Sequence, residues 1–293
     1  MSSARSLLYY AAMESAKLTA IVPTFNEEVN IRDCLLSVSF ADEVLVVDSF
    51  STDRTLEIAQ ECGARIIQRD YENSASQKNW AIPQASCEWI LLCDADERVT
   101  DELRLEILES IAGEPEHVGY SIPRANYFLG KRIRHCGWSP EQDRNIRLFM
   151  RDRSRYEEKQ VHADVMCEGS IGRLKSPFLH YSFRTLEQYI TKLNRYTTWG
   201  AGDVVNAGRR VGLLDLLLRP PVTFLKMFIL RAGFLDGFRG LLLCLFSAFY
   251  TLSKYAKASL LLRGERQSEE PVGGSAEPNE TSARQRAQDG PSD

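Results

Sequence analysis

The segment Trp89–Arg98 reads Trp-Ile-Leu-Leu-Cys-Asp-Ala-Asp-Glu-Arg, an apolar run followed directly by a cluster of acidic residues. Three similar apolar runs precede it, at Leu18–Val22, Val44–Val47 and Ala64–Ile67, and the four runs begin 26, 20 and 25 residues apart. This spacing is typical of strands that alternate with helices, and uninterrupted apolar runs are typical of parallel strands covered on both faces. The sequence therefore predicts an α/β fold with a mostly parallel, twisted sheet flanked by helices.

Residues 113–183 show no long hydrophobic period and are rich in Gly, Pro, Arg and aromatic residues, which predicts strands and loops that extend the sheet. Thr185–Gln188 has the sequence of a capping box and predicts the start of a helix. The apolar face expected for that helix consists of Leu186, Tyr189, Ile190 and Leu193.

Beyond Gly200 the chain becomes basic and strongly apolar. Its longest stretch without a charge, Gly240–Ser253, is shorter than the ~20 residues that a membrane-spanning helix needs. We expect residues 201–263 to form amphipathic helices that associate with a membrane surface, and a helical bundle packed on the core is the alternative. Residues 264–293 are too polar to bury a core and predict a disordered tail, and residues 1–16 predict a loose leader.

Composition excludes several classes of protein. The chain has 36 Lys and Arg against 40 Asp and Glu, and this net charge of −4 gives no support for a nucleic-acid partner. The seven cysteines include no Cys-x-x-Cys pair, which argues against a zinc ribbon and favours reduced thiols in a cytoplasmic environment. Neither a dinucleotide-binding Gly-x-Gly-x-x-Gly motif nor a P-loop is present.

Asp94 and Asp96 are the sharpest chemical signal. On extended backbone, residues i and i+2 point to the same side, which predicts a carboxylate pair at the carboxyl end of a strand, where open α/β sheets bind ligands. A divalent cation is the usual partner of two close carboxylates, and Mg²⁺ binds carboxylates together with substrate phosphates. Taken alone, the motif favours a solvated acidic turn, and the neighbouring strand ends shift the balance toward a metal site.

Polar residues also follow the other three apolar runs and predict further ligand contacts at the same edge of the sheet. Without a glycine-rich loop, a nucleotide would be held by carboxylates and a metal. The candidate donor-binding residues are Pro23, Thr24, Asn26, Glu27, Asp48, Ser49, Gln77, Lys78 and Asn79.

These motifs together resemble the family 2 glycosyltransferases of the GT-A fold, the nucleotide-diphospho-sugar transferases. The resemblance rests on Val22–Glu28, Val47–Asp53, Gln77–Ala81 and Asp94–Glu97. Further motifs are similar to the subgroup of lipopolysaccharide core glucosyltransferases and extend the resemblance over residues 18–262. They include Gly137–Pro140, Arg147–Phe149, Val161–His162, Leu179–Ser182 and Lys192–Tyr196.

The resemblance implies an inverting transfer of a sugar from a nucleotide-diphosphate donor, a UDP-hexose, to a lipid- or saccharide-linked acceptor in cell-envelope glycan synthesis. It implies a peripheral or monotopic enzyme at the cytoplasmic face of the membrane. Residues 17–200 would form the GT-A domain, with a donor half at 17–112 and an acceptor half at 113–200. Asp48 would face the nucleotide base, Asp94 would lie near the ribose or the metal, and Asp96 would ligate Mg²⁺ or Mn²⁺. Arg147 is expected to contact phosphate.

Inversion also needs a base on the far face of the sugar. Many members of the family have Val-His-Glu where this chain has Val161-His162-Ala163-Asp164, so the expected glutamate is absent. Asp143 ranks first among the remaining candidate bases, which also include Asp164 and Glu141. Trp138 and His162 are candidate acceptor-site residues. The alternative for Trp138 is a core tryptophan, and the alternatives for His162 are a structural histidine or a metal ligand.

Two other functions remain open from the sequence. A non-catalytic, nucleotide-sugar-binding membrane adaptor would explain the change at Ala163. A sugar nucleotidyltransferase would need a loop rich in Gly and Arg after the first strand, and Pro23–Asn26 does not provide one.

Overall fold

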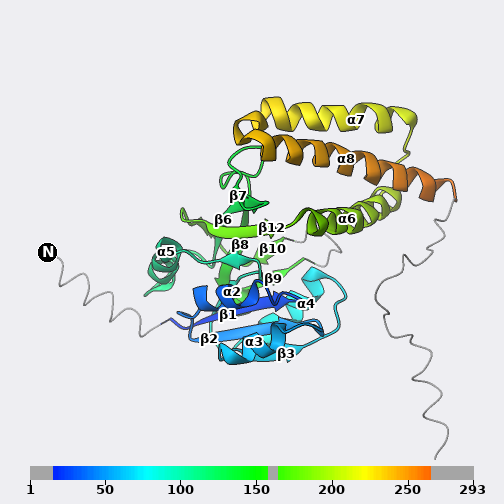
Figure 1. The fold of residues 1–293 in the computed structure, drawn as a ribbon. Helices are drawn as coiled ribbons and strands as arrows, with labels where there is room; N and C mark the ends of the chain where they lie inside the picture. The colour runs from blue at the N-terminus through cyan, green and yellow to red at the C-terminus, as the bar shows by residue number, and fades with distance from the viewer. Residues whose placement is uncertain (1–15, 158–163, 265–293) are drawn as a thin grey trace, which may run out of the picture.

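The computed structural model describes residues 16–157 and 164–264, so calls on residues 1–15, His162, Ala163 and the segment 265–293 lie outside the described residues. Four parallel strands form the N-terminal part of the sheet, as the spacing of the apolar runs predicts (Figure 1). In spatial order these are β3 (Arg65–Gln68), β2 (Glu43–Asp48), β1 (Leu18–Thr24) and β4 (Trp89–Leu92).

Beyond β4 the sheet becomes mixed and continues through strands that come from the second half of the chain. β8 (Arg144–Met150) runs antiparallel to β4, and β6 (Gly119–Phe128) runs antiparallel to β8. β12 (Phe178–Phe183) then pairs in parallel with β6, and β5 (Glu97–Arg98) pairs antiparallel with β12. The short strands β7 (Lys131–Arg132) and β11 (Ile171–Arg173) join β6, while β9 (Ser154–Tyr156) and β10 (Val165–Cys167) form a separate hairpin.

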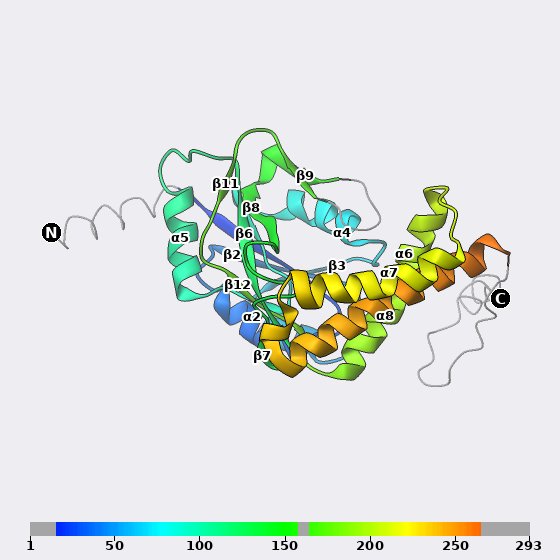
Figure 2. The ribbon, with the colours of Figure 1, turned by 90° about the horizontal axis from the view of Figure 1, so that it is seen from above.

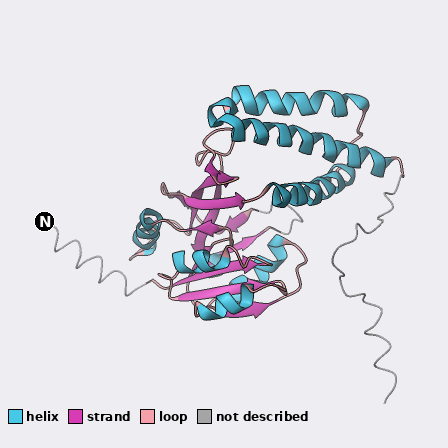
Figure 3. Cartoon of the chain, viewed as in Figure 1, coloured by secondary structure: helices cyan, strands magenta, loops and turns pink. Residues whose placement is uncertain are grey.

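Helices cover both faces of the parallel strands (Figure 3). Alternate residues of β1 therefore pack into two different cores: Ala20 and Val22 into one, Ile21 into the other. This double burial explains why these strands are uninterrupted apolar runs. The helices are α2 (Ile31–Ser37), α3 (Thr55–Glu61) and α5 (Asp101–Ile111) on one face, and α4 (Ser74–Ala81) with the 3₁₀ turn η1 (Ile82–Gln84) on the other.

The C-terminal part forms a helical layer stacked on the far part of the sheet, with α8 lying between α6 and α7 (Figures 1 and 2). Phe128 of β6 and Tyr189 of α6 share a third core with Leu243 of α8. Lys257 of α8 ties α8 to α6. Its ammonium lies within hydrogen-bond distance, 2.7–2.9 Å, of four oxygens on α6. The elements are α6 (Leu186–Asn206), α7 (Leu213–Leu225), the π-helical η3 (Lys226–Leu230), η4 (Gly233–Asp236) and α8 (Gly237–Leu262).

The capping box at Thr185 and Gln188 is confirmed, but the predicted apolar face of α6 is only half right. Tyr189 and Leu193 are buried, whereas Leu186 and Ile190 are 39% and 50% exposed. The neighbouring core covers only one narrow side of α6, whose buried residues are four positions apart, at 189, 193, 197 and 201.

The last helix is longer than the sequence suggests. Within the described part of the chain, the stretch Gly233–Leu262 is long and apolar enough to cross a membrane, judged by length and composition alone. The charge-free run is shorter because Arg239, Lys254 and Lys257 interrupt the apolar pattern near its two ends.

All seven cysteines are free and lie in the described part of the chain. Five are buried, and two pairs of sulfur atoms, Cys34 with Cys93 and Cys136 with Cys244, approach to 3.7 Å. Cys62 and Cys167 are partly exposed.

Candidate functional site

Two loops at the carboxyl ends of β1 and β2 are tied to each other. Asn26, which has a positive φ of 52°, donates its backbone N–H to the Ser51 hydroxyl and accepts from the Thr52 N–H. Ser49 donates its backbone N–H to the carbonyl of Thr24, which follows Pro23 at the end of β1. These bonds fix the predicted donor-binding residues of both loops at one edge of the sheet.

Asp48 is fully buried at the tip of β2. Its carboxylate accepts from the N–H and hydroxyl of Ser51 and from the Gln68 amide. Gln77 of α4 donates to the Ser49 hydroxyl at 2.8 Å, and Asn79 exchanges two hydrogen bonds with the backbone of Tyr156. Gln77 and Asn79 therefore hold β2 and β9 in place around the site.

Asp94 lies between two buried cations. Its carboxylate accepts from Arg147 at 2.5 Å and lies 3.6 Å from the Lys78 ammonium. Burial opposes ionisation of Asp94, but the charges of Arg147 and Lys78 hold its pKa well below the ordinary value. Arg147 also donates to the fully buried Glu97 at 3.1 Å. The Nε atom of Arg147 has no hydrogen-bond partner among the described residues.

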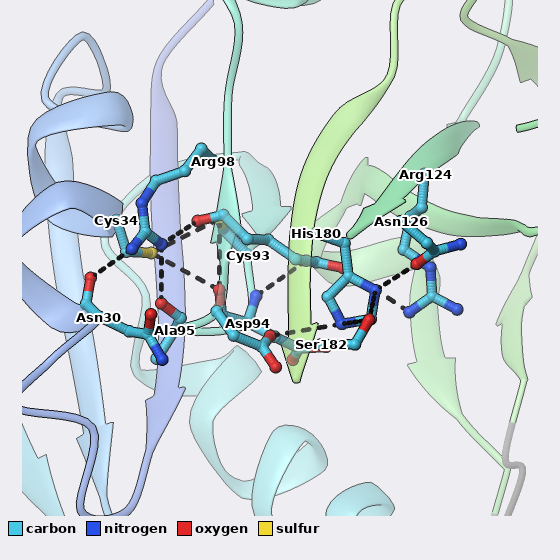
Figure 4. A network of polar contacts seen from close by, with 12 residues as sticks. Asn30, Cys34, Cys93, Asp94, Ala95, Arg98, Arg124, Asn126, His180 and Ser182 are labelled. Atoms are coloured by element: carbon cyan, nitrogen blue, oxygen red, sulfur yellow. Dashed lines mark hydrogen bonds and ion pairs between the residues drawn. The ribbon is translucent and has the colours of Figure 1, made fainter. Parts of the chain in front are cut away.

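Asp96 faces a different set of groups, among them His180, whose ring lies beside Asn126 and Ser182 (Figure 4). His180 Nε2 lies 3.6 Å from one carboxylate oxygen, and Lys192 Nζ lies 3.9 Å from the other. Burial opposes both charges, but each group favours the charged form of the other, so the pKa of Asp96 is lowered and that of His180 is raised. The pKa of Glu27, in the loop after β1, is raised mainly by burial. The nearby negative charge of Asp96 raises it further.

The premise that Asp94 and Asp96 share an extended backbone is wrong. β4 ends at Leu92, and the next residues form a turn in which the Glu97 N–H donates to the Asp94 carbonyl at 2.8 Å. The turn directs Asp94 toward Arg147 and Asp96 toward His180. Both carboxylates nevertheless lie at the predicted edge of the sheet and interact electrostatically.

The pairing of β12 with β5 and β6 brings His180 to this edge. His180 is in register with Glu97 on one side and with Asn126 on the other, and the Tyr181 N–H donates to the Asp96 carbonyl at 2.9 Å. The pair His180 and Glu97 joins positions 83 residues apart in the sequence. Next to it lies an open pocket of about 450 Å³, lined by Asp33, Arg98, Tyr127, Gly130, Tyr181, Phe183 and Arg184.

The side chains at this edge of the sheet supply some of the ligands that a divalent cation needs. Within residues 16–157 and 164–264, no three His, Cys, Asp or Glu side chains form a complete metal-binding group. Asp96 and His180 supply one carboxylate and one imidazole, both common metal ligands. A cation held by two protein ligands keeps positions for substrate phosphates, as Mg²⁺ sites usually do.

Asp143 is linked to His180 through Asn126. The His180 ring nitrogen Nδ1 lies 2.6 Å from Asn126 Oδ1, and Asn126 Nδ2 donates to the Asp143 carboxylate at 2.6 Å. Arg124 donates to the other oxygen of Asp143 at 3.0 Å and also lies 3.7 Å from Glu97. The network is therefore continuous from Asp96 to Asp143.

Of the other candidate residues, Trp138 touches this network through its backbone, because its carbonyl accepts from Asn126 Nδ2 at 3.2 Å. Glu141 is exposed in the turn before β8, and Asp164 is exposed at the base of the β9–β10 hairpin, where its carbonyl accepts from the Glu157 N–H. The Trp138 ring packs against Phe128 and Phe183 at 6.3 and 6.4 Å between ring centroids, as a core tryptophan does.

Four residues of the network were not assigned roles from the sequence: His180, Lys192, Arg124 and Asn126. The segment Phe178–Phe183 does carry a weak signal, because His180 and Ser182 alternate with apolar or aromatic residues in a strand pattern. Nothing in the sequence indicates which strand pairs with it.

Comparisons with known proteins show which family the sequence resembles. The sequence profile described as glycosyl transferase family 2 matches residues 19–178. The chain is 31% identical over 250 residues to the lipopolysaccharide core biosynthesis glycosyltransferase LpsC of Rhizobium meliloti, covering 82% of this chain and 91% of that protein. It is 30% identical over 262 residues to an uncharacterized glycosyltransferase of Rickettsia typhi, covering 84% and 89%.

Solved structures that resemble the chain include S. aureus TarS 1–349 in complex with UDP-GlcNAc, with a TM-score of 0.43 and 16% identity over 85% of this chain and 92% of that one. Another is glucosyl-3-phosphoglycerate synthase from Mycobacterium tuberculosis with Mn²⁺, UDP-glucose and phosphoglyceric acid. Its TM-score is 0.34, with 20% identity over 40% of this chain and 46% of that one.

Proposed function

The chain belongs to glycosyl transferase family 2, and we propose that this glycosyltransferase moves a hexose from a UDP-hexose to a saccharide- or lipid-linked hydroxyl, with inversion at the anomeric carbon. One observation carries this proposal: Asp96 with His180, and Asp94 with Arg147 and Lys78, converge at the carboxyl ends of the strands. The likeness to LpsC supports an acceptor of the lipopolysaccharide core type.

The proposed donor site combines the tied loops with the two buried cations. The loops that follow β1 and β2 would accept hydrogen bonds from the base and ribose, and buried Asp48 would hold the second of these loops in place through Ser51. Lys78 and Arg147 balance the diphosphate charge, which is consistent with their burial and their shared contact with Asp94. Asp96 and His180 would hold Mg²⁺ or Mn²⁺, which stabilises negative charge on a departing diphosphate when bound.

Asp143 is the proposed general base. It accepts the proton of the acceptor hydroxyl while the new glycosidic bond forms and the bond from the anomeric carbon to UDP breaks. Hydrogen bonds from Asn126 and Arg124 orient its carboxylate, and Asn126 ties it to His180. Glu141 and Asp164 lack such a link to the network in the described residues, which is why Asp143 is preferred.

The helical layer is the proposed membrane-binding surface, at the cytoplasmic face of the membrane. Many large apolar side chains are exposed on α7, η3 and η4 and at the start of α8, and exposed apolar surface of this kind is typical of interaction with a partner or a bilayer. Basic residues Arg209, Arg210, Lys226 and Arg231 lie beside it and suit anionic headgroups. The exposed apolar residues include Leu213, Leu214, Leu217, Leu218, Val222, Leu225, Leu230, Phe234, Leu235 and Phe238.

A donor assay tests the proposal. We expect the full chain to release UDP from UDP-glucose in the presence of Mn²⁺, with faster release when an acceptor is added. Asp96→Ala should abolish release while the protein stays folded by circular dichroism. Asp152→Ala, which removes an exposed carboxylate, is the matched control and should keep full activity. Undiminished release in Asp96→Ala, or in excess chelator, would contradict the proposal.

A further inference from the structure

One side of α6 carries four residues that the donor chemistry does not use. Lys192, Arg195, Tyr196 and Trp199 follow the i, i+3, i+4, i+7 spacing of a single helical face, and we call this set the α6 stripe. Tyr196 and Trp199 are 43% and 38% exposed, although large aromatic side chains favour burial. The buried side of α6 is a different one, which packs under α8.

The α6 stripe begins at the reaction centre. Lys192 lies 3.9 Å from Asp96 and 5.4 Å from the ring of Phe183. Trp199 is seven residues farther along, which places it roughly 10 Å away along the helix axis. This is about the length of two sugar rings, so a chain of sugars could lie along the stripe with its end near Asp96.

The stripe faces the donor half of the molecule. The loop between β3 and α4 reaches toward α6 in both views (Figures 1 and 2). Tyr71 of that loop lies close enough to Tyr196 and Arg195 for both to act on it: burial raises its pKa, Tyr196 raises it further and Arg195 lowers it. The same tyrosine interacts with Asp94. The loop that carries Tyr71, which is 52% exposed, therefore lies on the same side of the molecule as the stripe.

The side chains of the stripe suit a saccharide. The rings of Tyr196 and Trp199 lie 5.4 Å apart at 71°, and the Arg195 guanidinium lies 5.9 and 5.4 Å from their centroids. A sugar ring has an apolar C–H face, which an aromatic ring can cover, and a rim of hydroxyls. Arg195 and Lys192 can donate to those hydroxyls or to a phosphate or carboxylate on the sugar.

We infer that the α6 stripe binds the saccharide part of the acceptor and directs its terminal hydroxyl toward the network that joins Asp96, His180 and Asp143. This inference rests on the proposed function and adds the location and the class of the acceptor, an anionic oligosaccharide. Aromatic and arginine residues also occur at membrane interfaces. The stripe faces Tyr71 and Asp96, however, whereas the exposed leucines lie on α7, on the far side of α8 (Figure 1).

The test uses the full chain, UDP-glucose, Mn²⁺ and a deacylated, water-soluble lipopolysaccharide core oligosaccharide as the probe. Trp199→Ala and Tyr196→Ala should each raise the acceptor KM by about tenfold or more, since a stacking surface is lost. Trp199→Phe should restore most of the affinity. The matched control is Ile190→Ala, which truncates an exposed residue of α6 outside the stripe. Release of UDP without acceptor should stay unchanged in all four variants.

The readouts separate this inference from the proposed function. Absence of UDP release by the parent chain would overturn the proposed function. In that case the stripe is still tested by binding of the oligosaccharide, which is measured through its effect on tryptophan emission. An unchanged acceptor KM or Kd in Trp199→Ala and Tyr196→Ala would overturn the inference, as would a parent chain that does not bind the probe. Loss of vesicle binding with an unchanged acceptor KM would overturn it by assigning the stripe to the membrane.

Discussion

Replacing Arg147 with methionine tests the charge balance at the centre of the site. Arg147 is buried, and its Nη2 lies 2.5 Å from Asp94 and 3.1 Å from Glu97, which is itself fully buried. Methionine fills similar space but leaves both carboxylates without this partner. Breaking a buried ion pair costs about 3–5 kcal/mol. Lys78 at 3.6 Å and Arg124 at 3.7 Å still offset part of that charge, so we expect a loss near the lower end, ~3 kcal/mol.

The loss should depend on pH in a defined direction. Arg147 holds the pKa of Asp94 well below 3.8. The stability that this ion pair contributes is therefore fully present above the ordinary pKa of an aspartate, and it is lost as the pH falls through the lowered pKa of Asp94 in the folded protein. Without Arg147, the pKa of Asp94 rises, and so does that of Glu97, which burial already raises. Protonation of these two carboxylates then removes part of the unbalanced negative charge in the Arg147→Met variant. The difference in unfolding free energy between the variant and the parent protein should therefore be larger at pH 7 than at pH 5.

Urea unfolding of both proteins at the two pH values measures this difference. Arg54→Met, which removes an exposed pair with Glu57, is the matched control and should change stability little at either pH. A difference below about 1 kcal/mol at pH 7 would refute the reasoning, because that is the range of an exposed ion pair. An equal difference at both pH values would refute it as well.

Further outcomes follow from other parts of the molecule. Asp143→Asn should lower sugar transfer by about 10²-fold or more while UDP binding with Mn²⁺ stays within error, and transfer at the parent rate would exclude Asp143 as the base. His180→Ala should weaken Mn²⁺-dependent UDP binding in calorimetry, whereas equal Mn²⁺ dependence would remove His180 from the cation site. Changing Leu217, Leu218 and Leu225 to serine together should reduce co-sedimentation with anionic vesicles by more than about tenfold, and unchanged co-sedimentation would move the membrane surface elsewhere. Gly240→Ala should lower stability by about 1–3 kcal/mol in thermal unfolding, because a Cβ there would lie 2.1 Å from the Gly233 carbonyl oxygen. Gly202→Ala, with open space at that position, is its control and should keep or raise the Tm, so an equal effect of the two changes would contradict the packing argument.

Local patterns were sufficient to predict the parallel strands and the edge at which ligands bind. The apolar runs at Leu18, Val44, Ala64 and Trp89 became four parallel strands because burial on both faces leaves an uninterrupted signal. Thr185 was recognisable as a helix cap because the bond it makes reaches only three residues. The carboxylates after β4 were placed at the correct edge by the same logic.

What local patterns missed depends on contacts distant in sequence. His180 joins Asp96 only because β12 pairs with both β5 and β6. Leu186 and Ile190 fit an apolar helical face, but no neighbouring element covers them, and pattern alone cannot tell which part of a face will be covered. The i, i+2 argument for Asp94 and Asp96 failed because the strand ends two residues before the first of them.

The distribution of thiols has a practical consequence for spectroscopy. A thiol must be accessible and ionised to react with a maleimide, and burial raises the pKa of Cys167. Cys62 is the other partly exposed cysteine, and it follows α3 just before β3 begins. Its position is at the amino-terminal edge of the parallel strands, away from the edge that carries Asp94. A single fluorophore attached there would report on the enzyme in solution without any engineered cysteine and without obstructing the edge that carries Asp94.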